Sequence, residues 1–334
     1  MTEPLIRFNQ LSLSFASDEG RVRAVQDVTF DIQAGQTVGV VGESGCGKSV
    51  TAMSLMGLLP PQAARIDGGE ILFQGRDLLK LRSSQMADLR GNQLAMIFQE
   101  PMTALNPVLT IGEQLVEPLI RHRGESPKSA WTLATQMITE VGLARAESLM
   151  TSYPHQLSGG MLQRIMIAMA LSCKPQLLIA DEPTTALDVT VQAQILRLLR
   201  DQAQQNHMAL MLITHDLGVI AQMADHVVVM YAGKIVEQGA TADVLRNPLH
   251  PYTQGLIASR PTAGERRRRL YSIPGQVPSL AALPPYCAFT ERCGRATERC
   301  REGIPPLEGK HRQAACFYSG LTTAQENKDT ELQL

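Results

Sequence analysis

An eight-residue glycine-rich segment constrains this 334-residue chain more than any other feature. It lies between an apolar run typical of a buried strand, residues 37–41, and an expected helix from Lys48 to about Leu58. Its sequence, Gly42-Glu43-Ser44-Gly45-Cys46-Gly47-Lys48-Ser49, fits the phosphate-loop pattern G-x-x-x-x-G-K-[ST]. Glycines let backbone N–H groups curl around phosphates, and the helix N-terminus adds partial positive charge. The segment predicts a nucleotide site in which Lys48 reaches the β- and γ-phosphates and Ser49 ligates Mg²⁺.

The composition is that of a folded protein with a large core. Hydrophobic residues make up 44% of the chain, and 31 basic against 32 acidic residues give a formal charge of −1. These values argue against a disordered chain, and the absence of a basic excess argues against a surface devoted to nucleic acid. No secretory signal and no apolar stretch of about 20 residues is visible, so we expect a soluble, intracellular protein with reduced thiols.

Apolar strands alternate with helical patterns along much of the chain. Such alternation predicts a parallel sheet covered by helices. Residues 110–173 have a mostly helical pattern, which we expect to be broken at Pro118, at Pro127 and over residues 153–160. The other expected elements are strands over residues 5–15, 22–32, 94–98, 177–180, 208–213 and 227–231, and a helix over 189–205.

A second phosphate-related element is the apolar run 177–180 that ends in Asp181 and Glu182. An acid at the end of a buried strand matches the Walker B role, so Asp181 is expected to help hold Mg²⁺. Glu182 is a candidate to polarise the attacking water. The alternative is that Glu182 is simply a solvent-exposed charge at a strand end.

Between these two motifs lies Leu157-Ser158-Gly159-Gly160-Met161, at the start of an expected helix. Here the sequence resembles the ATP-binding cassette (ABC) family, whose signature motif is LSGGQ, with Met161 in place of the final glutamine. Further family motifs follow in the right order: Gln99 resembles the Q-loop glutamine, residues 185–188 the D-loop, and His215 the H-loop histidine. Phe15 stands where the family places an aromatic residue against adenine. The resemblance covers residues 5 to about 260.

The resemblance implies a fold and a mechanism. The fold is an α/β P-loop NTPase of ABC type, with a parallel-sheet core, an antiparallel β-subdomain and a helical subdomain at about 100–160. Two ATPase subunits would pack head to tail, so that the signature of one closes on the ATP of the other. Glu182 would act as general base, His215 and Gln99 would complete the catalytic group, and Asp188 would serve in the D-loop. The implied Mg²⁺ ligands are Ser49, Gln99 and Asp181, and the implied nucleotide contacts are Phe15, Gly42, Ser44, Gly45, Cys46, Gly47, Lys48, Ser49 and Val50.

Three segments narrow the resemblance to the D-type ATPase subunit of bacterial dipeptide, oligopeptide and nickel importers. This branch implies ATP-driven import of peptides across the inner membrane, with the chain peripheral on its cytoplasmic face. The implied partners are a second ATPase subunit, two transmembrane permeases and a periplasmic or lipid-anchored solute-binding protein, with no nucleic acid. A nickel chelate, glutathione or a peptide antibiotic remains an alternative solute. The three segments are residues 98–107, 153–161 and 247–253.

Two other classes of ABC protein are less compatible with the sequence. DNA-associated ABC ATPases carry long coiled coils or zinc modules between the phosphate loop and the signature. Here 57 residues separate Gln99 from Leu157, and they show no sustained heptads. Translation-type ABC proteins carry two cassettes, whereas this chain has one copy of the motif set.

The sequence pattern of the chain changes at about residue 260. We expect a nucleotide-binding domain over 1–260, a cysteine-rich extension over 261–320 and a flexible tail over 321–334. The arginine run 266–269 reads either as a solvated linker or as a contact for an anionic partner.

The extension holds four of the six cysteines: Cys287, Cys293, Cys300 and Cys316. Four thiolates can bind zinc or an iron–sulfur cluster, although no C-x-x-C pair typical of zinc is present. The resemblance implies a [4Fe–4S] cluster, and unligated thiols are the remaining alternative. Cys46 and Cys173 are not expected to be ligands. The positive charges expected to offset a cluster are Arg292, Arg295, Arg299 and Arg301.

Overall fold

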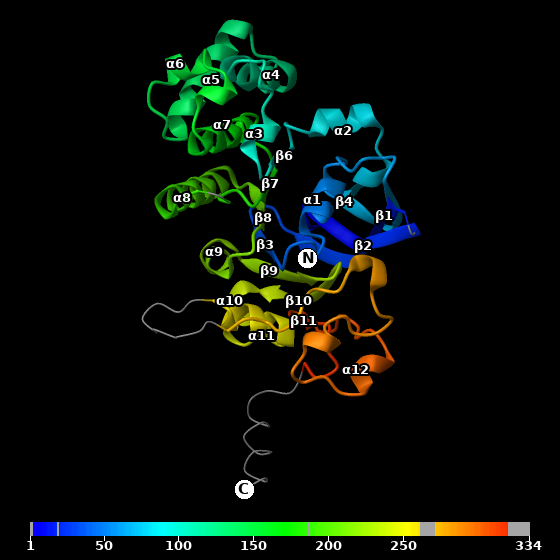
Figure 1. Cartoon of the computed structure of the whole chain (residues 1–334). Coiled ribbons are helices and arrows are strands. Elements are labelled where there is room, and N and C mark those ends of the chain that lie inside the picture. The colour runs from blue at the N-terminus through cyan, green and yellow to red at the C-terminus, as the bar shows by residue number, and fades with distance from the viewer. Residues whose placement is uncertain (1–2, 19, 186, 261–270, 320–334) are drawn as a thin grey trace.

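A computed structural model describes residues 3–18, 20–185, 187–260 and 271–319, and its centre is a seven-stranded sheet (Figure 1). The strand order is β11-β10-β9-β3-β8-β7-β6. The pairs β6–β7, β7–β8, β8–β3 and β3–β9 are parallel, whereas β10 and β11 run antiparallel to their neighbours. Every residue of β3, β7 and β8 is buried, which explains their continuous apolar sequences. The strands are β3 Thr37–Val41, β6 Leu94–Ile97, β7 Leu177–Asp181, β8 Ala209–Ile213, β9 His226–Tyr231, β10 Lys234–Ala240 and β11 Gln313–Ala314.

A second, antiparallel sheet has the order β2-β1-β4-β5. Its first two strands, β1 (Ile6–Ser17) and β2 (Gly20–Ile32), confirm the two strands expected at the start of the chain. Strand β1 buries Ile6 and Phe8, and then Leu11 and Leu13 after a register shift. The other two, β4 (Ala64–Phe73) and β5 (Arg76–Asp77), were not predicted. Half of the ten residues of β4 are polar or glycine and half are exposed, so its pattern gives little sign of a strand.

Helices cover both faces of the large sheet, and a helical part beyond β6 includes α3 to α7 (Figure 1). Together with the two sheets, this arrangement confirms the predicted α/β class with an antiparallel subdomain and a helical subdomain. The α-helices are α1 Lys48–Leu55, α2 Ser83–Leu89, α3 Pro101–Ala104, α4 Ile111–Arg123, α5 Pro127–Glu140, α6 Ala146–Met150, α7 Gly159–Leu171, α8 Val189–Asn206, α9 Leu217–Met223, α10 Thr241–Arg246, α11 Pro251–Ala258 and α12 Arg299–Glu302.

The expected break at Pro118 is wrong, because Pro118 lies inside α4. The helix is held by a capping box between Thr110 and Glu113 and by a fully buried stripe that includes Ile111, Leu115 and Leu119. Burial of this stripe outweighs the cost of a proline that lacks a backbone donor. Pro127, by contrast, occupies the first turn of α5, where proline is compatible with a helix start.

The described part of the extension, residues 271–319, consists of short elements around 3₁₀ turns and α12. Its strand β11 was not predicted, and it pairs with β10 at the edge of the large sheet through Glu237–Ala314 and Gln238–Gln313. The extension therefore continues the sheet of the core. The expected boundary at 260 stays a prediction, and the arginine run 266–269 and the tail 321–334 lie outside the described residues.

Within the described ranges, none of the helices combines the length and the apolar character that crossing a membrane requires.

Candidate functional site

The phosphate-loop segment connects β3 to α1, as its pattern predicts. Lys48 is 6% exposed, and its Nζ donates hydrogen bonds to the carbonyl oxygens of Gly42 at 2.8 Å and Glu43 at 3.0 Å. A Cβ at Gly42 (φ 153°) would lie 2.2 Å from the Met230 carbonyl oxygen, so the loop packs too closely on β9 for any other residue. The lysine charge is thus held inside a loop of closely packed backbone.

Asp181 ends β7 beside the start of α1. It is 4% exposed, and its Oδ1 has no hydrogen-bond partner. Burial raises the pKa of Asp181, and the nearby Glu182 adds to this, whereas a hydrogen bond with Ser49 acts in the opposite direction. A buried carboxylate oxygen without a partner, next to a serine hydroxyl, is a donor set that suits Mg²⁺. The residues therefore fit the predicted ion, and their roles as ligands remain predictions.

Glu182 is the point at which the predicted catalytic residues meet. Its Oε1 lies 3.2 Å from Nδ1 of His215, and its Oε2 accepts hydrogen bonds from Gln99 Nε2 at 3.3 Å and from Thr185 Oγ1 at 2.7 Å. Gln99, Glu182 and His215 follow β6, β7 and β8, which are adjacent parallel strands. Because the carboxyl ends of parallel strands lie at one edge, residues far apart in sequence converge there.

The environment of Glu182 keeps its carboxylate charged. Burial alone would raise the pKa of Glu182, but the hydrogen bonds from Thr185 and His215 and the electrostatic influence of His215 and Lys48 together lower it. An ionised carboxylate can accept a hydrogen bond from water and hold that water for attack. The alternative of an exposed strand-end charge does not describe this residue, whose side chain is 17% exposed.

The signature segment lies apart from this group, in the helical part (Figure 1). Ser158 caps α7 by accepting a hydrogen bond from the Met161 N–H at 3.4 Å, and Ser158 and Gly159 are exposed. Leu157 and Met161 are partly buried against the core, and Gly160 is half-buried. The exposed start of α7 thus offers backbone donors outward, as a site for an anion held by another subunit requires.

The remaining predicted residues surround the loop or start a neighbouring helix. Asp188 caps α8 by accepting a hydrogen bond from the Val191 N–H at 2.9 Å. Phe15 and Val50 are half-buried and pack against buried apolar residues of the core. Cys46 is 1% exposed and burial raises the pKa of its thiol, whereas Ser44 and Gly45 are exposed. Their contacts with nucleotide stay predictions.

Sequence reasoning named Thr185, Tyr252 and Arg292 in other roles and missed the contacts that these three side chains make with the loops. Thr185 contacts Glu182. The others hold Glu43 of the phosphate loop: its N–H donates to Tyr252 Oη at 2.8 Å, and its carboxylate pairs with Arg292. Tyr252 and Arg292 lie 209 and 249 residues from Glu43 in the sequence, and no local sequence pattern predicts contacts over such separations.

The four cysteines of the extension line one small cavity of about 20 Å³, together with Arg295. All four are free thiols, and burial raises the pKa of Cys293 and Cys316, with the neighbouring thiols adding to it. As placed, no three described His, Cys, Asp or Glu side chains form a group that could hold a metal ion. The donors suit a cluster, but the space would admit about one water. The [4Fe–4S] prediction is therefore unconfirmed.

The four arginines make contacts that their spacing in the sequence did not predict, and their expected role in offsetting a cluster stays a prediction. Arg295 lines the thiol cavity, but Arg292 pairs with Glu43 in the phosphate loop. Arg299 stacks over Phe317, with 4.9 Å from its guanidinium carbon to the ring centre, and Arg301 pairs with Glu291 at 3.4 Å. Arg292, Arg299 and Arg301 thus contact carboxylates or an aromatic ring, and their spacing in the sequence does not predict these partners.

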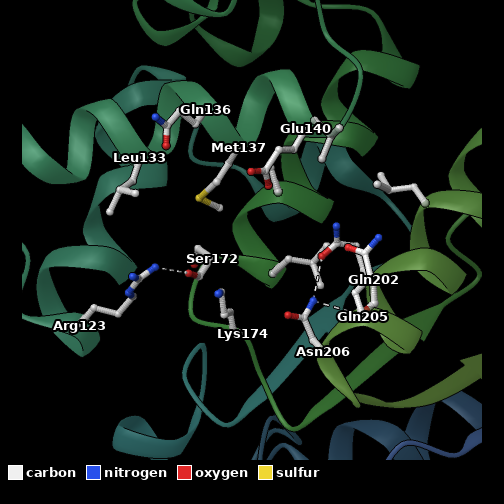
Figure 2. A pocket seen from close by; sticks show the side chains of 14 residues that line it. Arg123, Leu133, Gln136, Met137, Glu140, Ser172, Lys174, Gln202, Gln205 and Asn206 are labelled. Carbon is white, nitrogen blue, oxygen red and sulfur yellow. Dashed lines mark hydrogen bonds between the residues drawn. The ribbon is translucent and has the colours of Figure 1, made fainter.

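A cavity of about 580 Å³ lies between the helical part and α8, away from the loop (Figure 2). It is lined by α4, α5, α7, the turn after α7 and α8, and Arg123 at its wall donates a hydrogen bond to the Ser172 carbonyl oxygen at 3.3 Å. Lys174 and Glu140 give its wall both signs of charge. The predicted catalytic residues do not line it.

Comparison with known proteins agrees with the motifs. Residues 25–185 match the family model described as ABC transporter, and residues 236–300 match the one described as oligopeptide/dipeptide transporter, C-terminal region. The chain is 48% identical over 315 residues to the oligopeptide transport ATP-binding protein AppD of Bacillus subtilis, which covers 94% of this chain and 96% of that protein. It is 48% identical over 321 residues to the probable D,D-dipeptide transport ATP-binding protein DdpD of Escherichia coli, covering 95% and 98%.

Solved structures agree with this result. The dimeric post-hydrolysis structure of the ATP-binding cassette MJ0796 bound to ADP and Pi superposes with a TM-score of 0.64 and 25% identity, covering 71% of this chain and 98% of that one. A second dimeric structure of MJ0796, described as a bacterial ABC transporter cassette, gives the same TM-score at 26% identity. Sequence and fold together show that the chain belongs to the ATP-binding proteins of ABC transporters.

Proposed function

We propose that this chain hydrolyses ATP to power the import of peptides through a membrane transporter. The observation that carries the proposal is the convergence of Gln99, Thr185 and His215 on the Glu182 carboxylate, one residue from the buried Asp181. This group lies at the strand edge that also carries the phosphate loop. It therefore supplies an acceptor for water next to a site built for phosphates.

In the proposed mechanism, Lys48 and the loop N–H groups neutralise the charge of the β- and γ-phosphates. Mg²⁺, when bound by Ser49 and Asp181 with Gln99, supplies further positive charge to the phosphates. Glu182 accepts a hydrogen bond from the attacking water, and His215 holds the γ-phosphate and water in line. Thr185 keeps the Glu182 carboxylate in place and ionised through its 2.7 Å hydrogen bond.

A second ATPase subunit completes the site. The exposed Ser158 and Gly159 at the start of α7 are free to reach a nucleotide held by a partner, as the dimeric cassettes similar in fold suggest. Two permeases and a solute-binding protein complete the proposed transporter, with this chain peripheral on the cytoplasmic face of the inner membrane.

Peptides are the proposed solute because the relatives carry names for oligopeptide and dipeptide transport, and because residues 236–300 match the C-terminal region of that group. A nickel chelate, glutathione or a peptide antibiotic would need the same ATPase chemistry, since the solute contacts other subunits.

The test is transport by the reconstituted complex in proteoliposomes. With this chain and ATP inside the vesicles, and the solute-binding protein and a labelled dipeptide or oligopeptide outside, we expect the peptide to accumulate inside about tenfold more than with Glu182→Gln in this subunit. ATP-dependent uptake of a nickel chelate or glutathione, but of no peptide, would contradict the proposed solute. ATP hydrolysis without uptake of any of these would contradict the transport role.

For the extension, we propose that Cys287, Cys293, Cys300 and Cys316 are ligands of a [4Fe–4S] cluster. The support is the common cavity that the four thiols line together with Arg295. Such a group would supply a structural cross-link between loops that lack long helices or strands.

A further inference from the structure

The extension reaches the phosphate loop through a two-bond ion pair. Nη1 of Arg292 donates to Oε2 of Glu43 at 2.6 Å, and Nη2 donates to Oε1 at 2.9 Å. This is the fork-to-fork geometry in which arginine binds a carboxylate most specifically. Glu43 is the second residue of the phosphate loop, so the pair joins two parts of the chain that are 249 residues apart.

The guanidinium of Arg292 is enclosed and fixed. Its side chain is 5% exposed, its Nε donates to the Pro274 carbonyl oxygen at 2.9 Å, and Nη1 also donates to Tyr231 Oη at 3.4 Å. The guanidinium carbon lies 5.8 Å from the Tyr231 ring centre and 5.9 Å from that of Phe289. The Glu43 hydrogen bonds raise the pKa of Arg292 beyond its already high value. The arginine is therefore a rigid, permanently charged anchor.

Glu43 is held at its backbone as well. Its N–H donates to Tyr252 Oη at 2.8 Å, and its carbonyl oxygen accepts from Lys48 Nζ at 3.0 Å. Tyr231, Tyr252 and Phe289 pack together, with ring centres 4.7 to 5.5 Å apart. The side chain, N–H and carbonyl of Glu43 thus connect the extension to the lysine that meets the phosphates.

We propose that Arg292 is a positioning residue for the phosphate loop, through which the docked extension sets the affinity for MgATP. Fixing Glu43 fixes the carbonyl that orients Lys48, so less conformational freedom is lost when the phosphates bind. The proposal rests on the proposed function only in that ATP binds at this loop. It does not depend on the solute or on a metal in the extension.

A merely structural role for Arg292 is the alternative, and the chain contains a matched control. Arg312, also in the extension, pairs with Glu237 of β10 at 2.7 Å, and Glu237 is fully buried. This pair docks the extension on the core without contacting the phosphate loop. If docking alone mattered, breaking either pair would change nucleotide binding in the same way.

The test measures MgATP affinity of the full-length chain by calorimetry, with Glu182→Gln in every variant so that turnover does not interfere. We expect Arg292→Met to weaken binding about tenfold, Arg292→Lys to lie between it and the parent, and Glu43→Gln to resemble Arg292→Met. The double variant Arg292→Met with Glu43→Gln should bind MgATP no more weakly than either single variant, because both substitutions remove the same ion pair. Arg312→Met should lower the melting temperature while leaving affinity within about twofold of the parent.

Unchanged affinity in Arg292→Met, or equal losses in Arg292→Met and Arg312→Met, would overturn the proposal. Circular dichroism checks folding, and if Arg292→Met does not fold, Arg292→Lys and Glu43→Gln decide the question by the same comparison. Because the experiment uses only MgATP, a failure of peptide transport would leave its result unaffected.

Discussion

Thr185 Oγ1 donates a 2.7 Å hydrogen bond to Oε2 of Glu182, the same oxygen that accepts from the Gln99 amide. Thr185 lies three residues after Glu182, and the Thr185 N–H also donates to the Glu182 carbonyl oxygen at 3.2 Å. A tight turn therefore closes the threonine hydroxyl onto the proposed base. The result is a carboxylate whose orientation and charge are both controlled locally.

Replacing Thr185 with valine tests this control. Valine keeps the shape but removes the donor, so the pKa of Glu182 should rise, because a hydrogen bond to the charged form favours ionisation. We expect kcat of the assembled ATPase to fall about tenfold and the acid limb of its pH profile to move to higher pH. Thr185→Ser, which keeps the hydroxyl, should restore most of kcat and the original profile. An unchanged acid limb in Thr185→Val would show that the hydroxyl does not set this pKa.

Asp181 should determine the dependence on Mg²⁺. Its buried Oδ1 lacks a partner and burial raises its pKa, so the charged carboxylate destabilises the metal-free fold at neutral pH. In the metal-free protein, stability should therefore fall as pH rises from the unfolded pKa of Asp181 through its raised folded pKa. Asp181→Asn removes this charge.

We expect Asp181→Asn to raise the melting temperature in EDTA by about 2 °C, the size of a stabilisation near 1 kcal/mol. The same variant should lose the tighter ATP binding that Mg²⁺ confers, measured by titration with and without the ion. Ser49→Ala is a second test of the Mg²⁺ site in the same titration, since it removes a predicted Mg²⁺ ligand without removing a charge. Mg²⁺ enhancement of ATP affinity that survives in Asp181→Asn would contradict the assigned ion site.

Purification of the protein distinguishes three possible states of the cysteines in the extension: an iron–sulfur cluster, a zinc site and unligated thiols. Anaerobically purified protein should be brown and contain iron and sulfide in a ratio of about four to four per chain. Cys300→Ser should abolish the colour, whereas Cys173→Ser, at a cysteine outside the extension, should not. A colourless protein with one zinc per chain, or one without metal, would rule out the cluster.

Pro118 and Pro127 provide a prediction about the fold. Pro118 interrupts the hydrogen bonding of α4, whereas Pro127 occupies the first turn of α5, where its missing N–H costs little. Pro118→Ala should raise the free energy of unfolding by about 1–3 kcal/mol, and Pro127→Ala should change it by less than about 0.5 kcal/mol, measured by urea unfolding. Destabilisation by Pro118→Ala would mean that the ring itself packs favourably.

Local patterns predicted the parts of this protein that local physics determines. The phosphate loop and the buried strands follow from apolar runs that end in glycine or a polar residue. The catalytic roles expected for Gln99 and His215 came from the resemblance to the ABC family. Strand β4 was not predicted because half of its residues are polar or glycine and half are exposed. Pro118 misled because tertiary burial of α4 outweighs a local preference.

The long-range contacts of the extension could not be predicted in this way. Within the extension Arg292 contacts Pro274 and Phe289, and neither contact predicts its pairing with Glu43, which is 249 residues away. Strand β11 is only two residues long. Both features arise from docking of the extension on the core, which depends on surfaces assembled from distant segments. The arginines near the cysteines were accordingly read as a charge balance, when most of them contact other groups.

The most direct measurement of the central claim is the ATPase rate of the assembled transporter with Glu182→Gln in this subunit. Glutamine keeps the hydrogen-bonding shape but cannot accept the proton, so we expect ATP hydrolysis at this site to fall at least about a hundredfold while MgATP binding is retained. Glu302→Gln, which changes an exposed glutamate on α12, is the matched control and should hydrolyse ATP at the parent rate. Hydrolysis at the parent rate by Glu182→Gln would contradict the account, because the group assembled around Glu182 would then not be the catalytic centre.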